Sequence, residues 1–343
     1  MTVFIVVLAI IICLHYSLGR NFYHYSRYLA YFLLAFLSMF RYDVGSDYHV
    51  YVDLINGTQQ MTPYFETTMR AFIMIAQKTH TMWWFFAFFG FFTCYFFFRG
   101  IEEQADNRYE SLIIFMALFY LETMNLIRQG LALSMIFYAF KYVKQRNFKK
   151  YAFWVIIATL FHSSAFLAMG LYFVYHNVRL PYMLVLDVLA LIFWKPLTWG
   201  IVMIPIFSKY APYLYKVGIQ GDGNNAVRVF YLLLFLASFL AFYFIDDGKD
   251  RRSERYLSMI SLGLFFPFAL GANLGVRLAE YVNVFYLLLI PRLVHCCMRR
   301  FSIPRWMYML PFYGYYILYL CVDYMHSQSY TPYVFYFLKG LKI

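Results

Sequence analysis

Charged residues are scarce in this chain: only 13% of its 343 residues are Asp, Glu, Lys or Arg, whereas 63% are hydrophobic. The hydrophobic residues form long blocks, such as 85–98 and 227–245, rather than the amphipathic periods of water-soluble helices. Membrane β-strands would alternate apolar and polar residues, but these blocks are apolar on every face. The sequence therefore favours helices that use lipid as their solvent.

Several sequence motifs are absent as well. There is no Gly-x-x-x-x-Gly-Lys loop for nucleotide phosphates, no His-Glu-x-x-His for zinc and no Gly-x-Ser-x-Gly for a serine nucleophile. No internal repeat is present, which disfavours many transporter folds. The cysteines show no paired spacing, so we expect neither disulfides nor a metal site; they are Cys13, Cys94, Cys296, Cys297 and Cys321.

Basic residues exceed acidic ones by 29 to 17, but they stand in short loops between the apolar blocks. The positive-inside rule explains this pattern better than nucleic-acid binding does. We interpret residues 1–343 as a single all-α, polytopic transmembrane domain with roughly ten to twelve transmembrane or re-entrant helices and an external N-terminus. Cytoplasmic basic loops are expected at about 19–27, 99–110, 144–150, 246–256 and 295–305, and external loops at about 41–66 and 208–226.

Two of the apolar blocks are interrupted. Block 151–175 is broken at His162, and block 181–207 is broken at Lys195-Pro196. An even number of crossings between the flanking basic loops requires one split block, and we favour a hairpin in 181–207. We also expect an amphipathic interfacial segment at 64–78, a turn within 111–143 near Glu122–Gln129, and an out-and-back pair, 256–270 and 276–294.

Charges inside apolar blocks cost about 2.5–3.5 kcal/mol each, so they are candidates for function. Guanidinium groups match phosphate oxygens, and arginines at the outer helix ends are expected to converge on one outward-facing cavity. The alternative is local pairing of Arg128 with Glu122 and of Arg277 with Glu280. His162 suits either a general base or a structural hydrogen bond. The candidates are Arg70, Glu122, Arg128, His162, Asp187, Arg228, Arg277 and Glu280, with Arg41 at a helix end.

Three stretches resemble a known family. Residues 40–48, Phe-Arg-Tyr-Asp-Val-Gly-Ser-Asp-Tyr, followed by Tyr51, resemble the signature of the EpsG family, which is related to Wzy-type polysaccharide polymerases. Residues 125–129, Asn-Leu-Ile-Arg-Gln, and 161–164, Phe-His-Ser-Ser, resemble its Arg-Gln and Phe-His-x-Ser patterns. Arg277 with Tyr281 is a weaker match. The similarity covers residues 30 to 295.

The resemblance implies a glycosyltransferase of the bacterial cytoplasmic (inner) membrane. Such a polymerase joins oligosaccharide repeat units carried on undecaprenyl diphosphate, at the outer face, to make O-antigen, capsule or exopolysaccharide. It needs no metal and no cofactor, and its partners are the lipid-linked glycan, the bilayer and, as one option, a chain-length regulator. A GT-C-like helical fold is one arrangement consistent with this chemistry.

The resemblance also suggests roles for individual residues. Arg128 and Arg277 are expected to bind the two diphosphates together with Arg41 or Arg228, while Asp47 or His162 accepts the proton of the attacking hydroxyl. The alternatives are a lipid-linked oligosaccharide flippase, an O-antigen ligase, an acyltransferase built on His162, and a purely structural membrane protein. The expected substrate-binding residues are Arg41, Tyr48, Tyr51, Gln129, Arg228 and Tyr281.

Overall fold

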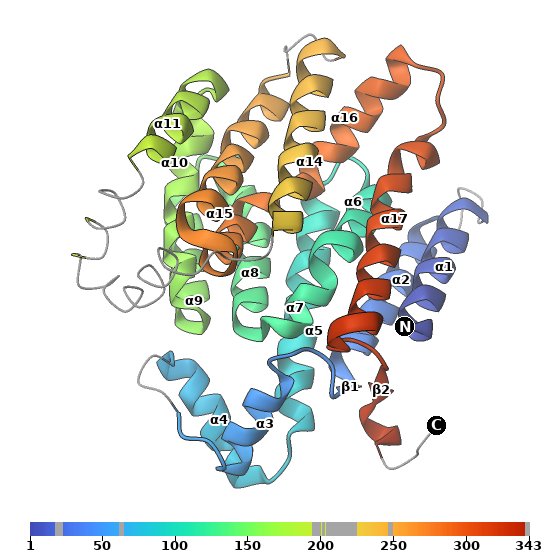
Figure 1. The fold of residues 1–343 in the computed structure, drawn as a ribbon, viewed down its shortest axis with the longest axis vertical. Helices are drawn as coiled ribbons and strands as arrows, with labels where there is room; N and C mark the ends of the chain where they lie inside the picture. The colour runs from blue at the N-terminus through green and yellow to red at the C-terminus, as the bar shows by residue number, and fades with distance from the viewer. Residues whose placement is uncertain are drawn as a thin grey trace. The chain divides into compact units, whose positions relative to one another are not determined.

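The computed structural model describes residues 1–17, 23–61, 65–193, 200, 203, 225–245 and 250–339 (Figure 1). These residues hold 15 α-helices and one pair of short strands. They divide into two compact units. The first contains Met1–Gln145, Lys149–Phe166 and Trp306–Ile343, and the second contains Arg146–Phe148 and Leu167–Arg305. The all-α prediction is therefore confirmed, whereas the single transmembrane domain stays a prediction.

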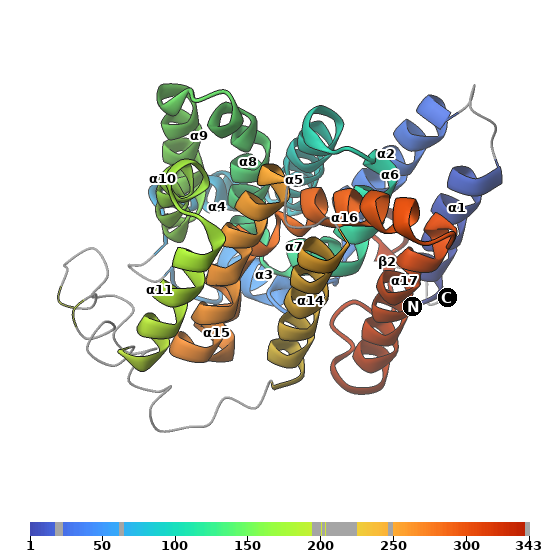
Figure 2. The same ribbon diagram turned by 90° about the horizontal axis from the view of Figure 1, so that it is seen from above.

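The first unit is built around α5 (Trp83–Gln104), which packs against α2 (Tyr23–Met39) and α8 (Ile127–Lys144). Figures 1 and 2 both show α5 between these two helices, with α1 (Thr2–Ser17) on the outer side of α2. Two glycines permit this close packing. A Cβ atom at Gly90 would lie 2.6 Å from the Ser38 carbonyl oxygen, and one at Gly100 would lie 2.6 Å from the Phe137 ring.

Among the described helices, α5 alone is long and apolar enough to cross a membrane. The segments Leu274–Asn283 and Tyr286–Arg300, which meet at an angle of 53°, pass the same test when they are counted as one span. Shorter apolar helices include Thr2–His15, Leu180–Ile192 and Val229–Phe244. The structure thus contains one or two candidate spans, and the multi-pass arrangement stays a prediction.

A sharp reversal follows α5. The chain passes through α6 (Arg108–Phe115), a π-helical turn (Met116–Tyr120) and α7 (Leu121–Asn125), and it breaks at Leu126 before α8 begins. A Cβ atom at Gly130 would lie 3.0 Å from the Cβ of Thr123, which is possible only because the backbone folds back at the break. The reversal lies within the predicted turn and presents the first residues of α8 at the end of the unit.

The segment expected as an external loop at 41–66 is more ordered than predicted. It contains strand β1 (Arg41–Tyr42) and helix α3 (Tyr48–Asn56), and β1 pairs antiparallel with β2 (Val334–Phe335). The buried face of α3, with Tyr48, Tyr51 and Leu54, explains why this polar stretch is helical. The expected amphipathic segment is found as α4 (Thr67–Thr79), although its interfacial position stays a prediction.

The second unit is built around α15 (Arg251–Asn283), which lies between α11 (Leu180–Ile192) and α14 (Asn225–Phe244). A Cβ at Gly275 would overlap the carbonyl oxygen of Phe266, although a straight helix would separate these residues by about 13 Å. The backbone of α15 therefore reverses between them, in agreement with the predicted out-and-back pair. Helix α16 (Tyr286–Arg300) follows it.

The predicted break at His162 is confirmed. Helix α9 (Phe148–Phe161) ends directly before it, and a 3-10 helix (Ser163–Met169) and α10 (Gly170–Asn177) follow. The hairpin favoured within 181–207 depends on a break at Lys195 and Pro196, which lie outside the described residues. Most of the expected loop 208–226 also lies outside them. The other expected loops overlap helix ends, as α5 reaches Gln104 and α16 reaches Arg300.

Candidate functional site

Arg128, in the first turn of α8, is the centre of a polar cluster in the first unit. Its Nη1 donates to Oε2 of Glu66 at 2.6 Å, and its Nε donates to the Tyr51 hydroxyl at 3.2 Å. The guanidinium also lies over the Phe65 ring, 4.5 Å from its centroid. The Arg128 side chain is 24% exposed, so the cluster fixes the cation and still leaves it accessible.

Glu66 contacts both Arg128 and the residues at the break between α9 and the 3-10 helix. Its Oε1 accepts a hydrogen bond from the Ser163 backbone N–H at 2.9 Å, and Nδ1 of His162 lies 3.7 Å from the same oxygen. Burial opposes ionisation of this carboxyl, but Arg128, the Ser163 N–H and His162 outweigh burial and lower the pKa of Glu66 below its ordinary value. Glu66 is therefore an anion that holds Arg128 and His162 together.

The signature loop of residues 44–47 is fixed to the α7–α8 break by Asn125. The amide oxygen of Asn125 accepts hydrogen bonds from the Ser46 hydroxyl at 2.7 Å and from the Asp47 backbone N–H at 2.9 Å. Gly45 has a φ of +99°, and a Cβ there would lie 2.9 Å from the Met124 carbonyl oxygen, so only glycine fits. The Val-Gly-Ser-Asp sequence thus brings Asp47 and α3 next to the start of α8.

Arg41 and Tyr48 form a second group on α5. The Arg41 side chain is 2% exposed, its Nη1 donates to the Ser38 carbonyl oxygen at 3.0 Å, and it lies over the Phe86 ring. Tyr48 stacks on the same ring, with centroids 4.3 Å apart. This burial differs from the expectation that Arg41 faces an outward cavity. The sequence pattern places Arg41 at a helix end that would be open to solvent, but in the fold β1, α3 and α5 cover that helix end.

The C-terminal segment packs against the signature loop. The Asp323 carboxylate accepts hydrogen bonds from the backbone N–H groups of Ser329 at 2.9 Å and Tyr330 at 3.0 Å, and it also accepts from the hydroxyl of Thr331. The Gly45 N–H donates to the Ser329 carbonyl oxygen at 2.6 Å. A segment distant in sequence therefore buttresses residues 44–47.

Glu122 also belongs to this region, because its Oε2 accepts from the Tyr330 hydroxyl at 2.9 Å. The local-pairing alternative assigned Glu122 to Arg128, but the acid that the structure pairs with Arg128 is Glu66, 62 positions away in sequence. Glu66, Phe65 and Asp323 were all missed by sequence reasoning. The sequence candidates are charges inside apolar blocks, whereas Glu66 is the N-cap residue of α4, so it is not among them.

The remaining predicted site residues lie elsewhere. Gln129 is buried in α8 at 3% exposure. In the second unit, Arg277 is exposed on α15 and Tyr281 is buried, while the side chain of Arg228 lies outside the described part of the chain. Arg128, Tyr51 and His162 are thus brought together around Glu66, and the convergence of Arg128, Arg228 and Arg277 on one cavity stays a prediction.

The comparisons agree with these motifs. The EpsG family model matches residues 24–335, a range that includes the signature loop, the Arg128 cluster and Tyr330. No curated protein and no solved structure matches the chain. The chain therefore belongs to the EpsG family, a membrane-associated family linked to exopolysaccharide biosynthesis.

Proposed function

We propose that this protein is a polysaccharide polymerase, a glycosyltransferase that joins oligosaccharide repeat units carried on undecaprenyl diphosphate. The reaction takes place at the outer face of the bacterial cytoplasmic membrane, in a multi-pass chain of roughly ten to twelve embedded segments. The family implies lipid-linked glycan substrates, which supports this substrate class. The enzyme uses neither a metal nor a cofactor.

One observation carries the proposal: the Arg128 cation is held by Glu66 and Tyr51 beside His162, with a quarter of its side chain accessible. A glycosyl transfer from a lipid diphosphate develops negative charge on the leaving group. A preorganised guanidinium stabilises that charge without rearrangement at the moment of reaction. Its planar fork matches two phosphate oxygens, and the Phe65 ring limits its rotation.

The proposed reaction has three linked events. The hydroxyl oxygen of the acceptor sugar attacks the anomeric carbon of the donor glycan and forms the new glycosidic bond. The bond between that carbon and the diphosphate oxygen breaks, and its electron pair leaves with the lipid diphosphate. The proton of the hydroxyl passes to a general base, either His162 or Asp47.

The geometry favours His162 as this base. Its imidazole shares the Glu66 carboxylate with Arg128, and a carboxylate beside an imidazole stabilises the imidazolium that forms when the proton arrives. Asp47 is anchored through its backbone to Asn125 and lies close to the cluster. We propose that Glu66 positions both His162 and Arg128. Tyr48, Tyr51 and Gln129 are each 3% exposed, so in this proposal they support the site from behind rather than contact the sugar.

Arg277 supplies the second diphosphate contact in this proposal, with Arg228 as a further cation and Tyr281 beside it. Arg277 is exposed on α15, as such a contact requires. Arg41 is buried against Phe86, which supports a role in holding β1 and α3 rather than direct contact with phosphate.

The test is complementation of a gene deletion in the native host. Wild type, Arg128→Ala and Arg128→Lys are expressed at matched membrane levels, and the surface polysaccharide is separated on a gel to count repeat units. Arg99→Ala is the matched control, because Arg99 also forms an ion pair with a glutamate, Glu103, at 2.6 Å but lies outside the Arg128 cluster. We expect Arg128→Ala to reduce polymer by about 100-fold, Arg128→Lys to restore part of it, and Arg99→Ala to retain the full ladder.

Other outcomes would change the proposal. If the deletion leaves no surface material at all, not even single repeat units, a flippase or a ligase explains the phenotype better. If Arg128→Ala gives a full ladder, the Arg128 cluster is not the reaction site, even though the family assignment stands.

A further inference from the structure

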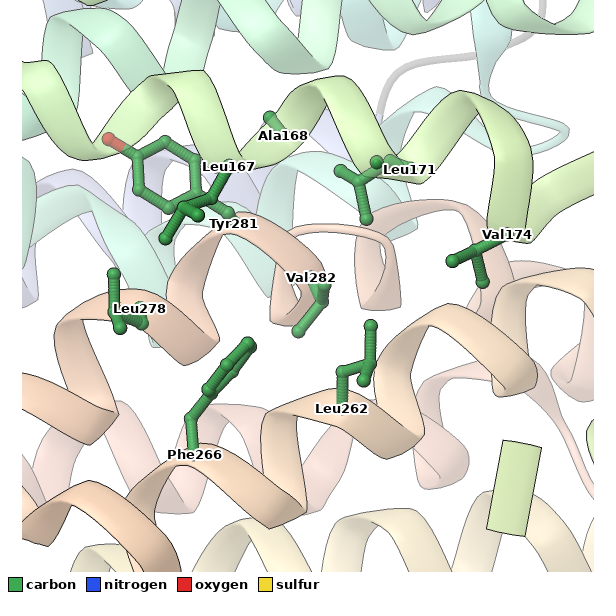
Figure 3. Close-up of a pocket in the computed structure, with 10 residues that line it drawn as sticks. Leu167, Ala168, Leu171, Val174, Leu262, Phe266, Leu278, Tyr281 and Val282 are labelled. Atoms are coloured by element: carbon green, nitrogen blue, oxygen red, sulfur yellow. The ribbon is translucent and has the colours of Figure 1, made fainter. Parts of the chain in front are cut away.

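The second unit contains an apolar cavity of about 100 Å³ that has no role in the reaction proposed above. It lies between the turn at the start of α10 and the two halves of α15 (Figure 3). The folded-back α15 supplies both sides of this wall, with Leu262 and Phe266 before the reversal and Leu278, Tyr281 and Val282 after it. The cavity therefore exists because α15 reverses.

The lining leaves no suitable place for ordered water. Almost every lining atom is apolar, and Figure 3 shows the Tyr281 hydroxyl directed away from Leu262 and Phe266. A water molecule needs two or more polar partners, whereas an engineered apolar cavity of about 150 Å³ stays dry and binds benzene. A cavity of about 100 Å³ thus suits one small branched hydrocarbon group, such as a single isoprene unit.

The cavity has exposed lining residues, and an exposed arginine stands next to one of its lining residues in the chain. Leu167, at its edge, is 42% exposed, and Gly170 is also exposed. Arg277 directly precedes the lining residue Leu278 and stands one helical turn before Tyr281, and its side chain is exposed. An apolar cavity with an exposed arginine next to its lining residues in the chain complements a ligand that has an anionic head and a hydrocarbon chain.

We infer that this cavity binds the isoprene unit nearest the diphosphate of a prenyl-diphosphate lipid, with Arg277 contacting the diphosphate. The inference rests on the proposed function for the choice of prenyl over acyl lipid, since the family implies lipid-linked glycan substrates. It assigns Tyr281 to the wall of the cavity, where its ring rather than its hydroxyl contacts the lipid.

The test measures binding of radiolabelled farnesyl diphosphate to the purified full-length protein in phosphatidylcholine nanodiscs. Gly170→Leu is the filling variant, because Gly170 lines the cavity and a Cβ there meets nothing within 4 Å. Gly314→Leu is the matched control. A Cβ at Gly314 also meets nothing within 4 Å, but Gly314 belongs to α17 (Arg305–Val322) and does not line the cavity. We expect Gly170→Leu to weaken binding about tenfold and Gly314→Leu to leave it unchanged.

Arg277 is tested with an uncharged ligand. Arg277→Gln should weaken binding of farnesyl diphosphate but not of farnesol, and Arg277→Lys should recover part of the loss. A photoreactive farnesyl diphosphate should label peptides containing Leu167–Val174 or Leu278–Val282, a result that does not depend on how well any variant folds. Unchanged binding in Gly170→Leu, or labelling confined to other peptides, would overturn the inference.

A competition experiment separates prenyl lipid from ordinary bilayer lipid. If phosphatidylglycerol competes as strongly as farnesyl diphosphate, the cavity is a general acyl-chain site and the inference is wrong. The polysaccharide ladder is a separate readout. If Arg128→Ala loses polymer as expected but Gly170→Leu binds the lipid unchanged, the cavity is rejected and the polymerase proposal stands. If Arg128→Ala gives a full ladder but Gly170→Leu weakens lipid binding, the cavity stands and the Arg128 site is rejected.

Discussion

Glu66 is the residue whose position decides the chemistry of the cluster. Each of its carboxylate oxygens has a different neighbour, Arg128 on one side and the Ser163 N–H with His162 on the other. Such a carboxylate stays ionised at neutral pH, and it orients a cation and an imidazole at the same time. The arrangement needs α4 to begin where it does, because Glu66 is its N-cap residue.

The first prediction concerns the pH dependence of this contact. Because the folded-state pKa of Glu66 lies below its ordinary value of 4.5, its stabilising contribution is present above about pH 4.5 and is lost as pH falls through the lowered pKa. Glu66→Gln should therefore lower the free energy of unfolding by about 1.5–3 kcal/mol at pH 7. The difference from wild type should shrink on acidification, as measured by thermal unfolding in detergent. An equal difference at all pH values would contradict this account.

The second prediction uses two glycines that share a positive φ. Gly45, at +99°, faces the Met124 carbonyl oxygen, whereas Gly57, at +76°, has nothing within 4 Å of an added Cβ. Gly45→Ala combines backbone strain with a backbone clash, at a cost of about 1–3 kcal/mol for the strain alone, and should displace the signature loop. We expect loss of most polymer in Gly45→Ala and a nearly normal ladder in Gly57→Ala. Equal ladders would show that the loop tolerates displacement.

At the scale of elements, the C-terminal segment is a support for the site rather than a loose tail. Its turn is organised by Asp323, it pairs through β2 with β1, and it contacts Gly45 and Glu122. Chain segments separated by most of the sequence thus fix the same loop. A change in this segment is expected to act on the reaction without touching the substrate.

The third prediction follows from that support. Asp323→Ala leaves the N–H groups of Ser329 and Tyr330 without their acceptor, so the segment 323–339 should loosen. Hydrogen exchange at the backbone amides of Val334 and Phe335 should become faster, and polymer yield should fall about tenfold. Asp106→Ala, at an exposed loop position, is the control. Unchanged exchange at β2 in Asp323→Ala would show that the other contacts suffice.

At the scale of the whole molecule, the distribution of basic loops predicts which segments face the cytoplasm. Thr58 belongs to the segment expected outside, and Lys149 belongs to the basic loop expected inside. Both positions are exposed, so each accepts a cysteine without disturbing the core.

The fourth prediction tests this topology by cysteine labelling in a variant whose five native cysteines are replaced by serine. A membrane-impermeant maleimide should label Thr58→Cys in intact spheroplasts, and it should label Lys149→Cys only after permeabilisation. Labelling of both positions, or of neither, before permeabilisation would reject the proposed orientation of the loops.

Sequence reasoning named three residues that the structure brings together around Glu66, and their roles stay predictions. Arg128, Tyr51 and His162 were candidates because a charge in an apolar block, or a motif residue, is visible in a local window. Glu66 was not visible in this way, since a carboxylate at a helix start looks like an ordinary solvated charge. The opposite error occurred at Arg41, which the local pattern places at an accessible helix end and which the fold buries.

The sequence by itself determined that this protein is helical, rich in lipid-compatible surface and a member of its family, because composition, periodicity and short motifs are local properties. The breaks at His162 and in α15 were also visible, since polar and glycine residues interrupt apolar blocks there. Only the tertiary structure decided that Glu66 pairs with Arg128, that Ser329 and Tyr330 bond to Gly45 and Glu122, and that the two halves of α15 line a cavity together with α10. Each of these depends on contacts between residues that no local window contains.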